Sequence, residues 1–203
     1  MAVSPYDNRL GADELDVRIT DLLVASADSS DALIDGSVQE TLKLLRERLQ
    51  MDVLFVSEFV DGKRVFRFVD SAQVDTPLKT GGAGPLDKSY CQLVSTGKLP
   101  ESIADLSALA ASRPELPSLP FRIGEHLSTP VVLKDGRIYG SLCCFSKSPN
   151  LHGRQRDLTQ LKQCAQLVAR MIDAGSSGSR RPMPDSVPDW SLSPVESKDV
   201  WKL

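Results

Sequence analysis

Two Asp-Gly dipeptides, at Asp61-Gly62 and at Asp135-Gly136, each join two short runs of apolar residues. Asp-Gly is favoured in two-residue hairpin turns, because both central positions of such a turn need a positive φ. The sequence therefore predicts two antiparallel hairpins. The predicted strands are residues 53–60 and 64–71 around the first turn, and residues 125–133 and 137–146 around the second.

The strand predicted at residues 53–60 is apolar on both of its faces. Successive side chains of a strand point to opposite faces of the sheet. One face carries Val53, Phe55, Ser57 and Phe59, and the other carries Leu54, Val56, Glu58 and Val60. Because both sets are largely apolar, we expect a central strand that is covered on two sides.

Three segments repeat apolar residues at the spacing of an amphipathic helix. They are residues 13–27, about 31–50 and about 153–173. Two of these helices precede the first hairpin and one follows the second. The order predicts an α+β domain with helices at both ends of the chain.

The segment between the hairpins predicts a further helix. Residues 76–84 read as a flexible connection, and Gly84-Pro85 then places a proline at a suitable first helical position. Gly97 is well placed to end this helix. Ser102 and Ile103 predict a short strand, and residues 104–117 predict a loop with one helical turn.

Two residues of the second hairpin have special backbone requirements. Pro130 has no backbone N–H group, which predicts a bulge or an edge position in its strand. Gly140 predicts the close passage of another chain segment, because glycine has no Cβ atom.

Composition excludes several classes of function. The formal net charge is −3 with both signs spread along the chain, so no basic face for nucleic acid is indicated. No apolar stretch approaches the roughly 20 residues that span a bilayer. The N-terminus has acidic residues and a proline where a signal peptide would be basic and apolar, which predicts a cytoplasmic protein.

The small number of cysteines predicts reduced, free thiols rather than a disulfide framework. Four cysteines in 203 residues are too sparse for such a framework. Cys143 and Cys144 are adjacent, so we expect them on opposite faces of one strand.

The last thirty residues differ in composition from the rest of the chain. Residues 174–203 contain seven serines, four prolines and two glycines, which predicts a disordered tail. Trp190 and Trp201 are the only tryptophans of the protein. They are either docking anchors for a protein partner or incidental residues of a linker. The predicted organisation is an N-terminal extension (1–12), one domain (13–173) and this tail.

Three stretches of the chain resemble the GAF domain family. GPLDKSYCQLVSTGKLPESIADLSA (84–108) resembles its central helix with the strand and loop that follow. IGEHLSTPVVLKDGRIYGSLCCFS (123–146) resembles its last hairpin, and RQRDLTQLKQCAQLVARMI (154–172) resembles its closing helix. The motifs SYCQLV and YGSLCCFS are similar to GAF modules found beside cyclic-dinucleotide and histidine-kinase signalling domains. The resemblance covers residues 13–173.

This resemblance implies a central antiparallel sheet, with the terminal helices on one face. The middle helix and loops would close a pocket over the other face. Many members of the family bind a small molecule there, and they commonly dimerise through the first and last helices. The leading hypothesis is a non-catalytic sensory or regulatory module of bacterial-type signalling, with no cofactor identified. The resemblance and strand alternation give the candidate ligand-binding residues Phe55, Ser57, Tyr90, Cys91, Asp105, His126 and Ser128.

Two alternatives remain open at this stage. The domain could be a ligand-free scaffold for dimerisation and protein docking. Less favoured is a free methionine sulfoxide reductase, which carries a cysteine in a place comparable to Cys91. That enzyme needs further cysteines nearby to resolve a sulfenic acid, and residues 104–126 contain none.

Other chemistries of the family find no support in the sequence. Gln92 follows Cys91 where a bilin site would have a histidine, and there is no Asn-Lys-Phe-Asp-Glu signature for a cyclic nucleotide. No His/Cys/Asp spacing indicates a zinc site.

Overall fold

The structure is a computed structural model that describes residues 33–73, 76–119, 121–150 and 155–178. The predicted extension 1–12, the predicted helix 13–27, and residues 179–203 of the predicted tail, with Trp190 and Trp201, lie outside the described residues. The prediction that the tail begins at residue 174 was wrong, because residues 174–178 continue the last helix.

The described strands form one six-stranded antiparallel sheet in the order β3-β2-β1-β6-β5-β4. Both predicted hairpins are present, and they share this sheet because β1 pairs with β6. The α+β prediction is therefore confirmed. The strands are β1 (Val53–Val60), β2 (Lys63–Ser71), β3 (Ala83–Pro85), β4 (Ser102–Ile103), β5 (His126–Val132) and β6 (Ile138–Phe145).

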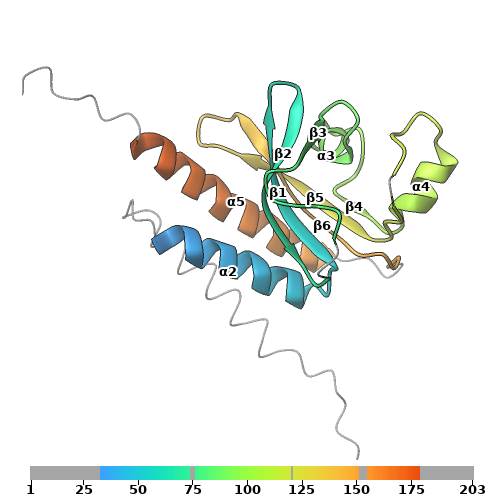
Figure 1. Cartoon of the computed structure of the whole chain (residues 1–203), viewed down its shortest axis with the longest axis horizontal. Coiled ribbons are helices and arrows are strands. Elements are labelled where there is room, and N and C mark those ends of the chain that lie inside the picture. Colours follow the sequence, from blue (N-terminus) through green and yellow to red (C-terminus); the bar gives the residue numbers. More distant parts are fainter. Residues whose placement is uncertain (1–32, 74–75, 120, 151–154, 179–203) are drawn as a thin grey trace, which may run out of the picture.

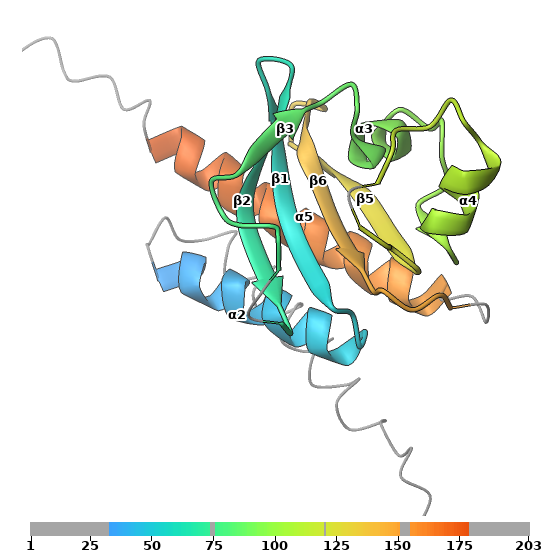
Figure 2. The same cartoon turned by 45° about the vertical axis from the view of Figure 1, so that its right-hand side comes forward.

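The helices lie on the two faces of the sheet as expected. The long helices α2 (Leu33–Arg48) and α5 (Gln155–Gly178) lie side by side across one face (Figure 1). The short helices α3 (Tyr90–Ser95) and α4 (Leu106–Ser112) lie on the other side, as the turned view in Figure 2 also shows. None of the helices in the described ranges is long and apolar enough to cross a membrane.

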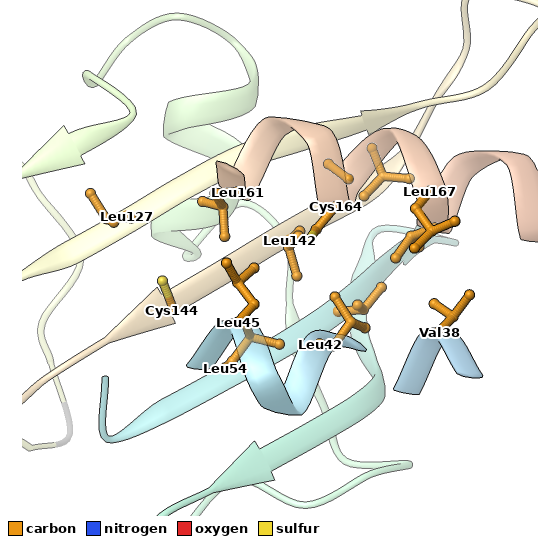
Figure 3. Packing of buried hydrophobic residues seen from close by; sticks show 14 of the residues in the cluster. Val38, Leu42, Leu45, Leu54, Leu127, Leu142, Cys144, Leu161, Cys164 and Leu167 are labelled. Atoms are coloured by element: carbon orange, nitrogen blue, oxygen red, sulfur yellow. The ribbon is translucent and has the colours of Figure 1, made fainter. Parts of the chain in front are cut away.

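The larger core lies between the sheet and the two long helices (Figure 3). Leu42 and Leu45 of α2 and Leu161 of α5 face the strands there, and all three are buried. The apolar stripes of α2 and α5 are thus packed within the domain. Burial of each leucine side chain stabilises the fold by about 1.5–3 kcal/mol.

A second core lies on the opposite face of the sheet. Leu54 and Val56 of β1 belong to the helix-side core, whereas Val53 and Phe55 belong to this second core. The prediction that β1 is covered on both sides is confirmed. Cys143 and Cys144 likewise lie in opposite cores, although both are buried.

The prediction that a helix begins at Gly84-Pro85 was wrong. Ala83–Pro85 pairs with β2 as an edge strand, where a proline is tolerated because its missing N–H group is not needed for the ladder. Helix α3 begins only at Tyr90, where the Ser89 hydroxyl accepts the backbone N–H of Gln92 at 3.2 Å. Gly97 follows this helix with a φ of 71°, as its predicted role requires.

Gly140 and Pro130 both occupy positions that their chemistry permits. A Cβ atom on Gly140 would lie 1.8 Å from the carbonyl oxygen of Ser57, so the predicted close passage is confirmed. The backbone N–H of Ser128 bonds to Glu101 beside β4, and the nitrogen of Pro130, two residues on, points to the same side. Strand β4 does not extend as far as Pro130, so this part of β5 is an edge.

Candidate functional site

A cavity lies between the second face of the sheet and the covering formed by α3, α4 and the loop before β5. It encloses about 580 Å³ of empty space, counting the part that is open to solvent. Its apolar lining includes Phe55, Phe66, Leu106, Phe121, Ile123 and Phe145.

Four phenylalanines form a connected aromatic wall. The rings of Phe55 and Phe66 meet edge to face with centroids 5.1 Å apart. Phe145 lies 6.5 Å from Phe55 and 5.7 Å from Phe121, again between centroids. Such ring pairs stabilise one another beyond their buried area, so the wall is fixed before any ligand enters.

A β-bulge at Arg67 sets the direction of the residues that β2 contributes. Val56 pairs with Phe68 and Ser57 pairs with Phe66, which leaves Arg67 without a partner across the ladder. Phe66 therefore faces the cavity, whereas Phe68 packs against the helix-side core.

Arg64 brings a cation to the cavity wall. Its Cζ atom lies 4.7 Å from the centroid of the Phe66 ring, and its Nη1 donates to the Cys91 sulfur at 3.6 Å. Its Nε–H group is buried, and no acceptor for it exists in the part of the chain that the structure describes. An unsatisfied buried donor of this kind costs about 1–3 kcal/mol.

His126 is a second polar side chain at the cavity wall with an unused atom. The residue is 3% exposed, and its Nδ1 has no hydrogen-bond partner among the described residues. Burial, and secondarily the positive charge of Arg64, lowers the pKa of His126 to about 4. The imidazole is therefore neutral at pH 7.

A pair of thiols lies at the cavity, with Cys91 in its wall and Cys143 next to Cys91. The sulfur atoms of Cys91 and Cys143 lie 3.4 Å apart, and both residues are buried. The hydrogen bond from Cys143 lowers the pKa of the Cys91 thiol, and the charge of Arg64 acts in the same direction against burial. Burial raises the pKa of the Cys143 thiol.

Four of the seven residues predicted from the sequence line the cavity. They are Phe55, Tyr90, Cys91 and His126. The hydroxyl of Tyr90 donates to the carbonyl oxygen of Pro117 at 2.7 Å, which ties α3 to the covering loop.

The other three predicted residues do not line the cavity. Ser57 is buried, with its Oγ 2.9 Å from the Oγ of Ser141. Ser128 is buried with its Oγ 3.0 Å from the sulfur of Cys143.

Asp105 has a structural position at the start of α4. Its carboxylate caps this helix by accepting the backbone N–H of Ala108 at 3.0 Å, and it also pairs with Arg122 at 3.1 Å. Both carboxylate oxygens are thus engaged within the protein.

Sequence reasoning missed Arg64, Phe66, Lys88, Phe121 and Phe145. Arg64 lies two residues after the first Asp-Gly turn. A charged side chain at such a position is normally expected to point into solvent. Strict alternation places Phe66 and Phe68 on one face, and only the bulge separates them. No pattern in the sequence announces that bulge.

Within the described ranges, no three His, Cys, Asp or Glu side chains gather closely enough to hold a metal ion.

Comparisons with known proteins agree with the fold. Residues 34–172 match the family profile of the GAF domain. The chain therefore belongs to the GAF domain family. A search of curated proteins gave no match to this sequence.

Solved structures with this fold include both an enzyme and sensors. The free methionine-R-sulfoxide reductase of Neisseria meningitidis, solved with its substrate, is 15% identical with a TM-score of 0.61. The match covers 88% of this chain and 98% of that one. A GAF sensor protein from Burkholderia vietnamiensis is 11% identical with a TM-score of 0.61, covering 82% of this chain and 98% of that one.

A third similar structure is the phycoerythrobilin-bound GAF domain of a cyanobacterial phytochrome. It is 13% identical with a TM-score of 0.58, covering 84% of this chain and 99% of that one. At these identities the likeness concerns the fold alone.

Proposed function

We propose that this chain is a regulatory module that binds a small molecule with an apolar body and one anionic group. The cavity between the sheet and α3 is the proposed binding site. In this proposal the chain changes no bond in the ligand and acts by transmitting occupancy to its terminal helices.

One observation carries the proposal. Two polar side chains at the wall of an apolar cavity, half-buried Arg64 and buried His126, each have a buried nitrogen atom without a partner in the described part of the chain. Buried polar groups are normally paired, because leaving them unpaired is costly. A carboxylate or phosphate would accept from Arg64 and offset that cost.

The charge of the cavity lining also favours an anion. Arg64 and Lys88 both line the cavity, and the lining among the described residues contains no carboxylate, so two cations face the single negative charge that a Cys91 thiolate can supply. The aromatic wall offers a rigid apolar surface for the remainder of the ligand. The phytochrome domain that holds phycoerythrobilin and the reductase solved with its substrate are family relatives in fold with a bound molecule.

Native mass spectrometry of the full chain tests the proposal. We expect a retained mass in the purified protein that, once released, belongs to a compound with a carboxylate or phosphate. The Arg64→Met variant should lose this mass. Arg122→Met is a matched control, because Arg122 is an exposed arginine outside the cavity.

The ligand-free scaffold is the competing reading, and the same measurement separates it. A stable dimer with no retained mass, and with no dependence on Arg64, would favour the scaffold. The described apolar stripes of α2 and α5 pack within the domain, so they do not themselves require a partner. A dimer through the terminal helices and a docking role for Trp190 and Trp201 stay proposals.

Reductase activity is a second candidate function, and a specific observation favours it. The loop 104–126 lacks a cysteine, but the structure places the Cys143 sulfur 3.4 Å from that of Cys91. A resolving thiol is therefore at hand. Consumption of free methionine-R-sulfoxide with dithiothreitol as reductant tests this, and equal rates for the wild type and Cys91→Ala would exclude it.

The thiols also bear on location. The structure shows four free cysteines, Cys91, Cys143, Cys144 and Cys164, and we propose a reducing compartment such as the cytoplasm.

A further inference from the structure

Cys91 and Cys143 come from elements that are 52 residues apart in the chain. Cys91 lies in the first turn of α3, and Cys143 lies in the middle of β6. Their sulfur atoms are 3.4 Å apart. A disulfide needs about 2.05 Å between sulfur atoms, so closure requires a movement of less than about 1.5 Å.

The surroundings of the two sulfur atoms differ. Cys91 lines the cavity and receives the guanidinium N–H of Arg64, which stabilises a thiolate. Cys143 does not line the cavity, and hydroxyl groups surround its sulfur. Ser128 Oγ lies 3.0 Å away and Ser141 Oγ lies 3.2 Å away.

These environments suit two successive roles in thiol oxidation. The nucleophile must be a thiolate that a small oxidant can reach, and Cys91 faces the cavity beside a cation. The resolving thiol must lie close to that sulfur and shielded from the oxidant. Cys143 is fully buried behind Cys91.

We propose that Cys91 and Cys143 form a reversible redox pair, at which hydrogen peroxide entering the cavity drives formation of an intramolecular disulfide. The Cys91 thiolate attacks one peroxide oxygen, the O–O bond breaks, and hydroxide leaves with the electron pair. The Cys143 sulfur then attacks the resulting sulfenic acid. The S–S bond forms, the S–O bond breaks, and the Cys143 proton leaves with the hydroxyl as water.

The disulfide would alter the proposed binding site. A bonded sulfur carries no negative charge, so the acceptor for the Arg64 Nη1 is weakened. The bond would also hold the first turn of α3 against β6. Two equivalents of an external thiol restore the reduced pair by exchange.

Peptide mapping of the oxidised full chain tests the proposal. The protein is treated with hydrogen peroxide, unfolded in iodoacetamide and digested with trypsin. We expect a linked species that joins peptide 89–98, which holds Cys91, to peptide 138–147, which holds Cys143 and Cys144. With Cys144 carbamidomethylated, its mass should be lower by two hydrogen atoms than the sum of the two peptides, and dithiothreitol should abolish it.

Neighbouring cysteines supply matched controls. Cys144 is as buried as Cys143 but lies in the other core, and Cys164 lies there too. Cys144→Ala and Cys164→Ala should keep the linked species, and Cys91→Ala and Cys143→Ala should lose it. Because the result in the wild type needs no variant, a folding defect in a variant does not decide the test.

Three results would overturn the proposal. One is carbamidomethylation of both Cys91 and Cys143 in the peroxide-treated wild type. Another is a bond through Cys144 or between two chains. The third is oxidation of Cys91 to sulfinic acid with no linked peptide at any peroxide dose.

Discussion

Arg64 stacks on Phe66, with the guanidinium carbon 4.7 Å from the centroid of the ring, and yet leaves its Nε–H group without an acceptor among the described residues. The contact fixes the cation at the cavity wall. The unsatisfied donor means that the arrangement does not serve stability alone. A side chain that is held in place at a cost is typical of a binding site.

Arg64→Met should therefore leave the ligand-free protein as stable as the wild type, within about 1 kcal/mol, or make it slightly more stable. The variant loses the ring contact but also removes the unsatisfied donor. Urea unfolding measures the difference.

Arg46 is the matched control for this prediction, because it is a buried arginine whose partners are present. It bonds to Asp70, to the carbonyl oxygen of Met51 at 3.3 Å and to Glu47 at 3.4 Å. Arg46→Met should cost about 2–3 kcal/mol. An equal loss for both variants would mark Arg64 as a structural residue.

His126 should make stability depend on pH. The imidazole has a pKa of about 6.5 in an unfolded chain and about 4 in the folded protein. Between these values the unfolded chain binds a proton that the folded protein does not, so stability falls as pH drops through this window. The loss should approach about 3 kcal/mol at the acid end.

The difference between wild type and His126→Asn isolates this contribution from that of the carboxylates. The unfolding free energy of the wild type minus that of the variant should fall by about 3 kcal/mol between pH 7 and pH 4. Parallel curves would show that His126 is not the buried neutral group described above.

Alanine substitutions at Gly140 and at Gly36 should have opposite effects on the stability of the protein. A Cβ atom at Gly140 would collide with the backbone of Ser57 in β1, so Gly140→Ala should destabilise the sheet by about 3 kcal/mol or more. Gly36 lies in α2 with nothing within 4 Å, so Gly36→Ala should stabilise the protein by about 1 kcal/mol. Thermal unfolding gives both values, and a Gly140→Ala variant as stable as the wild type would contradict the register of β1 and β6.

Asp105 should matter for stability and not for binding. Asp105→Ala removes the cap of α4 and should cost about 1 kcal/mol, whereas Asp105→Asn keeps a capping oxygen and should cost less. Ligand retention, measured by native mass spectrometry, should be unchanged in both variants. Loss of the ligand in Asp105→Asn would instead show that Asp105 contributes to ligand binding.

The sequence predicted the fold well because its signals are local. The Asp-Gly turns and strand alternation define both hairpins, and the double-sided β1 identifies the centre of the sheet. The misplaced start of α3 has an equally local cause. Gly84-Pro85 suits a helix start and an edge strand equally, and only pairing with β2 decides between them.

The site was less predictable because its residues meet through long-range contacts. The bulge at Arg67 turns Phe66 and Arg64 toward the cavity, and Phe121 and Phe145 join them from other segments. Asp105 was predicted as a ligand residue, but its carboxylate is engaged by α4 and Arg122. The closeness of Cys91 and Cys143 depends on how α3 packs on β6, which no sequence pattern specifies.

The central claim is that the cavity recognises an anion through Arg64. Its most direct test is the thermal stability of the full chain with pairs of aromatic acids and their amides, such as phenylacetate and phenylacetamide. The account predicts that at least one acid raises the melting temperature, that its amide does not, and that Arg64→Met abolishes the difference. Equal shifts for every acid and its amide, or no shift with any acid, would contradict it.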